Sequence, residues 1–163
     1  MTITNEDNMK VMARYEDNHF DLAIVDPPYG IGVDGNKEQR WENGRIKRKA
    51  HKLKDWDSAI PTAEYFNELK RVSKNQIIWG GNYFTEYLKP TKAWIFWYKA
   101  QQGLTMSDGE LAWTSLKKVT RMYTLHRIHL WQEKPIHPTQ KPVKLYEWLL
   151  MNYAKEGDKI LDT

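Results

Sequence analysis

The sequence contains no cysteine, which excludes a disulfide framework and a metal site built on thiolates. No apolar run approaches the roughly 20 residues that a membrane-spanning helix requires. The first residues are polar and lack the basic and then apolar order of a secretory signal. We therefore expect a cytoplasmic protein that has neither a membrane nor a metal as a partner.

The composition is that of an ordinary globular protein. Its 163 residues fit one domain, with 40% hydrophobic and 28% charged residues. Lysine and arginine number 25 against 21 acidic residues, a net charge of +4 that permits a nucleic-acid partner without requiring one. We expect a single domain over residues 1–163.

Short apolar runs alternate along the chain with segments of helical periodicity. This alternation predicts an α/β fold whose mostly parallel sheet is covered on both faces. Strands are expected at 20–25, 76–79, 93–98 and 159–161, two more between 110 and 124, and helices at 9–15, 62–72, 83–88 and 143–153.

Ligands of such sheets bind beyond the carboxyl ends of the strands. The residues at those positions are Asp26 to Gly30, Gly80 to Asn82, Lys99 and Asp162. The two adjacent glycines fit either a plain turn or a place where a substrate approaches the backbone closely.

The tetrapeptide Asp26-Pro27-Pro28-Tyr29 follows the first predicted strand. Two prolines fix the backbone and make a stiff, extended hook. The Asp26 carboxylate and the Pro27 carbonyl can act together as acceptors beside the flat ring of Tyr29, which suits an exocyclic amino group on a planar base such as adenine. The alternative is that the prolines only end a strand and Asp26 caps the next turn.

Two segments resemble the amino-group DNA methyltransferases, which methylate adenine N6 or cytosine N4 with S-adenosyl-L-methionine (SAM). FDLAIVDPPYG resembles their catalytic motif, and HPTQKP at 137–142 resembles the segment that leads into their SAM-binding half. The catalytic motif comes first here, as in the permuted branch of that family. The resemblance implies a Rossmann-like SAM methyltransferase sheet.

The resemblance also implies a role for each residue of the two segments. Asp26, Pro27, Pro28 and Tyr29 would be catalytic and would hold a base flipped out of the duplex. Aspartate rather than serine at the first position favours adenine N6. This interpretation requires that Asp26 is not turned inward into a salt link and that Tyr29 is not sealed in the core. The residues implied in cofactor binding are His137, Thr139, Gln140, Lys141 and Asp162.

Residues 34–57 form the most polar part of the chain. Between Lys37 and Lys54 there are eight basic residues and two acidic ones, with almost no apolar periodicity. We expect a mobile basic surface insertion that contacts double-stranded DNA, and the alternative is a solvated loop without a ligand. The residues expected to bind DNA are Trp41, Arg45, Lys47, Arg48 and Lys49.

The chain departs from the family pattern after Asp162, where a glycine-rich loop would follow. We therefore expect the C-terminal part of the SAM-binding half to be missing, and this chain alone to bind SAM weakly and to turn over slowly or not at all. One alternative is a truncated, inactive remnant that binds nucleic acid. Another is methylation of RNA or of a protein amide by a related site.

Overall fold

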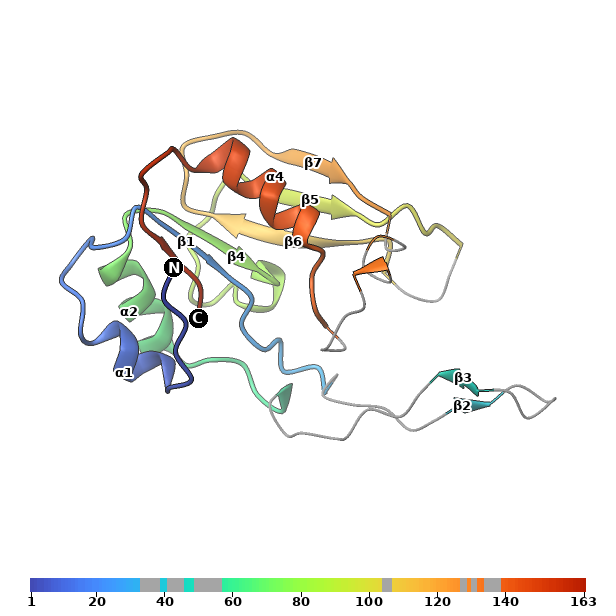
Figure 1. Ribbon diagram of the computed structural model, residues 1–163, viewed down its shortest axis with the longest axis horizontal. Coiled ribbons are helices and arrows are strands. Elements are labelled where there is room, and N and C mark those ends of the chain that lie inside the picture. Colours follow the sequence, from blue (N-terminus) through green and yellow to red (C-terminus); the bar gives the residue numbers. More distant parts are fainter. Residues whose placement is uncertain are drawn as a thin grey trace.

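The computed structural model describes residues 1–32, 39–40, 46–48, 57–103, 107–126, 129, 132–133 and 139–163. Six strands form one sheet in the order β7-β5-β6-β4-β1-β8, and Figure 1 labels all of them except β8. The strands are β1 (Leu22–Val25), β4 (Gln76–Trp79), β5 (Ile95–Tyr98), β6 (Gly109–Thr114), β7 (Arg121–Thr124) and β8 (Ile160–Leu161). The helices are α1 (Asn8–Met12), α2 (Ala63–Val72) and α4 (Val143–Tyr153), with a short 3-10 turn η2 (Gly81–Tyr83).

The sheet is mostly parallel, as the sequence predicts. β1 pairs in parallel with β4 and β8, and β5 pairs in parallel with β7. Of the six strands described in this sheet, β6 runs opposite to the other five, because it is antiparallel to both β4 and β5. Only residues 99–108 connect β5 to β6, and a parallel crossover needs about a dozen residues or more.

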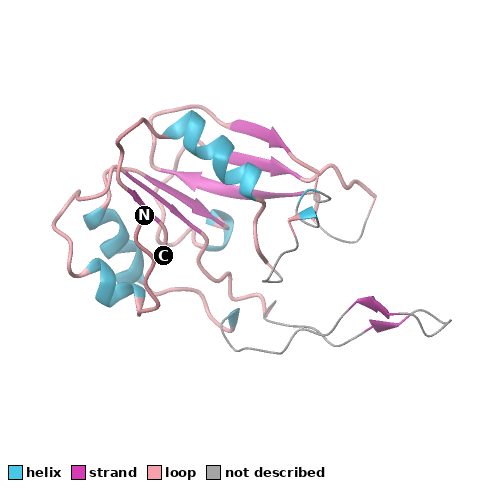
Figure 2. Ribbon diagram, viewed as in Figure 1, coloured by secondary structure: helices cyan, strands magenta, loops and turns pink. Residues whose placement is uncertain are grey.

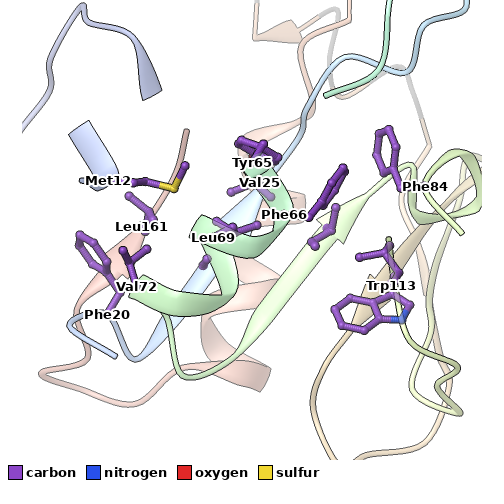
Figure 3. Packing of buried hydrophobic residues seen from close by; sticks show 13 residues of the cluster. Met12, Phe20, Val25, Tyr65, Phe66, Leu69, Val72, Phe84, Trp113 and Leu161 are labelled. Carbon is purple, nitrogen blue, oxygen red and sulfur yellow. The ribbon is translucent and has the colours of Figure 1, made fainter. Parts of the chain in front are cut away.

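Helices cover both faces of the sheet (Figure 2). Ala23 and Val25 of β1 pack with α1 and α2 in one core cluster, which Figure 3 shows from close by. Leu22 and Ile24, the alternate residues of the same strand, pack with α4 in a second cluster. All four residues of β1 are buried, so this strand is fixed from both sides and the residue that follows it has a defined position.

Two predicted helices differ from the structure. The first helix ends at Met12 rather than Tyr15, and Asp7 caps it by accepting a hydrogen bond from Lys10 N. The helix predicted at 83–88 is absent, and the described residues there form η2 followed by turns. Gly80, in a left-handed conformation, starts this tight turn directly after β4. No helix of the described part has the length and apolar character to cross a bilayer.

The basic insertion contains two short strands that the sequence analysis did not expect. β2 (Gln39–Arg40) and β3 (Ile46–Arg48) pair antiparallel, away from the main sheet in Figure 1. The insertion is closed at its base by Asp57, whose carbonyl accepts from Gly32 N at 3.1 Å and whose carboxylate accepts from Gly30 N at 2.8 Å. Residues 34–38, 41–45 and 49–56, on which most of the expected mobility falls, lie outside the described residues.

Candidate active site at the carboxyl edge of the sheet

Asp26 follows the last residue of β1 and begins the proline hook. Its side chain is 26% exposed, whereas Pro27 is buried and Pro28 is half-buried. The two prolines end the strand because they cannot donate to a sheet ladder. The hook therefore holds the Asp26 carboxylate at the carboxyl edge of a strand that is itself fixed on both faces.

Tyr29 turns its hydroxyl back onto Asp26. The Tyr29 hydroxyl donates to Asp26 Oδ1 at 2.7 Å and lies 3.5 Å from Glu110 Oε2. Burial and the negative charges of Asp26 and Glu110 raise the pKa of Tyr29. The hydroxyl therefore keeps its proton and remains a donor to Asp26, while the half-buried ring is not sealed in the core.

Lys141 forms the salt link that the sequence analysis required Asp26 to avoid. Its Nζ lies 2.5 Å from Asp26 Oδ1 and donates to the Tyr29 hydroxyl at 3.1 Å. The expectation of a carboxylate without an ionic partner was thus wrong, because the loop before α4 brings Lys141 over the hook. The Asp26 side chain is nevertheless not turned inward, since it stays 26% exposed at the sheet edge. Both contacts end on Oδ1, and within the described part of the chain no donor reaches Asp26 Oδ2 or the Pro27 carbonyl oxygen.

Glu110 and Lys99 extend the charged cluster along the sheet edge. Glu110 Oε1 lies 2.5 Å from Lys99 Nζ, and Oε2 lies 3.3 Å from Lys141 Nζ. Burial alone would raise the pKa of Glu110, but the charges and hydrogen bonds of Lys141 and Lys99 hold it below its usual range. Two carboxylates and two ammonium groups therefore balance one another at this edge.

The turn after β4 packs directly against Tyr29. Gly80 has φ +68°, and a Cβ placed there would lie only 2.2 Å from the Tyr29 ring. The ring of Tyr83, which is 43% exposed, stacks on Tyr29 with centroids 5.0 Å apart and planes at 17°. Both glycines are therefore places of close approach: the Tyr29 side chain lies against Gly80, and Trp113 lies against Gly81.

Asp162 and Tyr146 complete the edge on the β8 side. Partial burial of the carboxyl group and the charge of Asp26 raise the pKa of Asp162 to about 6, although the residue as a whole is exposed. Burial and the charges of Asp162, Asp26 and Glu110 raise the pKa of Tyr146 on α4. Tyr146 and the three carboxyl groups therefore lie close enough for their charges to influence one another.

The structure brings together some of the residues implied by the resemblance. Asp26, Tyr29 and Lys141 are in contact, and the half-buried Thr139 and Gln140 directly precede Lys141. His137, Trp41, Arg45 and Lys49 lie outside the described residues, as do the side chains of Lys47 and Arg48. Within the described ranges, no group of three or more histidine or acidic side chains is arranged to hold a metal ion.

Sequence reasoning missed Glu110, Tyr83 and Tyr146. If every strand were parallel, the first residues of each strand would lie at the amino edge of the sheet. Because β6 is reversed, its first residues, including Glu110, lie at the carboxyl edge instead. The ten-residue connection before β6 was a usable signal of that reversal. The positions of Tyr83 and Tyr146 depend on a turn and on the rotation of a helix, for which the sequence contains no comparable signal.

Comparison with known proteins gives one informative similarity. No family model matches the chain. The chain is 26% identical to the type II methyltransferase M.HpaI of Haemophilus parainfluenzae, in an alignment that covers 94% of this chain and 60% of that protein. The chain thus spans about three fifths of the length of this relative.

Proposed function

We propose that this chain carries the catalytic site of a DNA methyltransferase that transfers a methyl group from SAM to the N6 amino group of a flipped adenine. The observation that carries the proposal is the geometry of Asp26. Tyr29 and Lys141 both bind Oδ1, which leaves Oδ2 and the Pro27 carbonyl oxygen as a pair of acceptors on a rigid hook. The similarity to a type II methyltransferase over most of the chain supports methyl transfer from SAM to DNA, and the choice of adenine N6 rests on the hook alone.

The acceptor pair supplies what an exocyclic amino group needs to react. The lone pair of that nitrogen is delocalised into the ring, so the nitrogen is a poor nucleophile in the free base. Hydrogen bonds from its two N–H groups to Asp26 Oδ2 and the Pro27 carbonyl would favour a tetrahedral nitrogen with a localised lone pair. Because the hook is held before the base arrives, these bonds require little reorganisation.

Tyr29 would provide the surface on which the flipped base stacks. In the free protein Tyr83 is stacked against Tyr29, with ring centroids 5.0 Å apart. A base cannot fit between two rings at this separation, since each stacked pair needs about 3.5 Å. Stacking on this face of Tyr29 therefore requires the exposed Tyr83 ring to move, and an exchange of one flat partner for another limits the cost of that movement.

The residues at this edge fit a cationic methyl donor. Among the described side chains at this edge, the three carboxyl groups of Asp26, Glu110 and Asp162 face the two ammonium groups of Lys99 and Lys141, so acidic groups are in excess. SAM, when bound, supplies a methyl group on a positively charged sulfur. Asp162 would hold SAM, together with His137, Thr139 and Gln140, which precede Lys141 in the sequence. The contribution of Lys141 to cofactor binding stays a prediction, since the contacts found for its ammonium group are with Asp26, Tyr29 and Glu110.

The basic insertion would bind the DNA backbone next to this site. Its base is tied to Gly30, the residue after Tyr29, through Asp57. Neutralising Arg45, Lys47, Arg48 and Lys49 should then reduce the slope of log K against log salt by about 0.9 for each phosphate group that the variant no longer binds. An unchanged slope would assign these residues to a solvated loop.

The decisive experiment identifies the methylated base. The purified chain is incubated with unmethylated DNA and methyl-labelled SAM, and the DNA is then digested to nucleosides. SAM is supplied in large excess, because weak SAM binding and slow turnover are expected of this chain, and we expect any label in N6-methyladenine. Label in N4-methylcytosine would overturn the choice of base. DNA binding without any label would favour a remnant that has lost catalysis.

A further inference from the structure

The charged side chains beside Asp26 form a row of alternating sign. Asp26 contacts Lys141 at 2.5 Å, Lys141 contacts Glu110 at 3.3 Å, and Glu110 contacts Lys99 at 2.5 Å. The proposed reaction needs only the first of these groups. The rest of the row therefore calls for its own explanation.

The Lys141 ammonium group has no spare hydrogen-bonding capacity. An ammonium group has three donors, and three acceptors surround this one: Asp26 Oδ1, the Tyr29 hydroxyl and Glu110 Oε2. The Lys141 side chain is only 4% exposed, and its Nζ lies over the rings of Trp79 and Tyr29 at 5.3 and 5.5 Å. If one acceptor were removed, the freed N–H could not readily turn to solvent.

We propose that Glu110 is a positioning residue for Asp26 that acts through Lys141, by holding one donor of the ammonium group away from Asp26 Oδ2. This inference rests on the proposed function, in which Oδ2 accepts from the amino group of the base. Without Glu110, the free N–H of Lys141 turns to the nearest remaining acceptor, and the Asp26 carboxylate is the nearest anion. Lys99 keeps Glu110 paired and oriented on its other oxygen.

The test uses Glu110→Leu, which removes both the charge and the acceptor, and Glu110→Gln, which keeps an acceptor oxygen without the charge. We expect Glu110→Leu to lower turnover at saturating DNA by up to about 10²-fold, the effect of a small displacement of a reacting group. Glu110→Gln should have an intermediate effect, and KM for DNA should change little in either variant. The matched control is Glu68→Leu, since Glu68 forms an ion pair of the same kind with Arg71 on α2 and should keep full turnover.

Action through Lys141 predicts that the effects are not additive. In a chain that already carries Lys141→Met, Glu110→Leu should cause no further loss of turnover. The ammonium group that Glu110→Leu would release is absent from that chain. A further loss in the double variant, or wild-type turnover in Glu110→Leu, would overturn the inference.

A second measurement separates this inference from the proposed reaction. The ¹³C chemical shift of the Asp26 carboxyl group reports its surroundings without any turnover. It should move in Glu110→Leu, stay in place in Glu68→Leu, and not respond to Glu110→Leu when Lys141 is already methionine. If these shifts behave as expected while the wild-type chain methylates no DNA, the proposed function fails and the positioning role of Glu110 stands. If the Asp26 signal does not respond to Glu110→Leu, the positioning role fails.

Discussion

β1 has an aspartate at each end, and the two carboxylates are used in opposite ways. Asp21, before the strand, binds Lys74 Nζ through Oδ1 at 2.6 Å and Lys159 N through Oδ2 at 3.0 Å. Asp26, after the strand, receives both of its contacts from the described residues on Oδ1. The side chains are similarly exposed, at 30% and 26%.

The difference shows that hydrogen-bond partners, and not exposure, distinguish a structural carboxylate from a candidate catalytic one. Both oxygens of Asp21 are used to join the starts of β1, β4 and β8, so its contacts are complete within the fold. Asp26 is fixed through one oxygen while the other faces no donor of the described chain. A rigid group with an unused acceptor is suited to a ligand, because binding requires no rearrangement.

Replacing each aspartate by alanine should separate the two roles and give the largest effect. Asp26→Ala should lower methyl transfer by about 10²- to 10³-fold, the loss that typically follows removal of one preorganised hydrogen-bonding group. Asp21→Ala should lower the thermal midpoint while leaving turnover close to that of wild type. The measurements are initial rates with methyl-labelled SAM and thermal unfolding of the same samples. Equal losses of turnover in the two variants would contradict the assignment of a structural role to Asp21 and a catalytic role to Asp26.

The arrangement around Asp26 also depends on Gly80, which gives the second prediction. Gly80→Ala places a Cβ 2.2 Å from the Tyr29 ring, so the ring that donates to Asp26 must move. Gly103→Ala is the matched control, since Gly103 has φ +80° with nothing within 4 Å of the added atom. In both variants the free energy of unfolding should fall by roughly 1–2 kcal/mol, because alanine is unfavourable in the left-handed conformation.

Only Gly80→Ala should also lower turnover, by up to about 10²-fold for a displaced reacting group. Rates and thermal midpoints of the two variants measure this difference. Equal rates in both would mean that the position of Tyr29 does not matter for Asp26.

The residues that could be predicted from sequence are those whose positions follow from local patterns. The apolar run before Asp26 and the prolines after it specify a strand end and a stiff hook, and the periodicity of residues 143–153 specifies α4 with the observed bounds. The salt link between Asp26 and Lys141 joins residues 115 positions apart, and its geometry depends on how the loop before α4 crosses the sheet edge. The position of Glu110 depends on the direction of β6, which the strand pattern itself does not contain and which only the short connection from β5 indicates.

The stacked pair of tyrosines gives a third and smaller prediction. Tyr83→Ala removes a ring that competes with the base for Tyr29, and an aromatic pair contributes about 0.5–1.5 kcal/mol. Binding of DNA whose adenine is already unpaired, opposite an abasic site, should therefore become tighter by up to about tenfold. Fluorescence anisotropy measures this affinity, with a fully paired duplex as the comparison. Weaker binding of the unpaired adenine would mean that Tyr83 holds the base instead of competing with it.

The smallest expected effect is a pH dependence of the thermal midpoint, caused by Asp21 at the amino end of β1. The hydrogen bond from Lys74, together with that from Lys159 N, lowers the pKa of Asp21. A carboxyl group with a lowered pKa stabilises the fold at pH values above its ordinary pKa of about 3.9, and this contribution is lost as the pH falls through the folded value. The thermal midpoint of wild type should therefore exceed that of Asp21→Asn at neutral pH, and the gap should close on acidification below about pH 4. If the difference in thermal midpoint stays constant across the acid range, Asp21 acts through the geometry of its hydrogen bonds and not through its charge. The contrast between Asp21 and Asp26 would then rest on hydrogen-bond geometry alone.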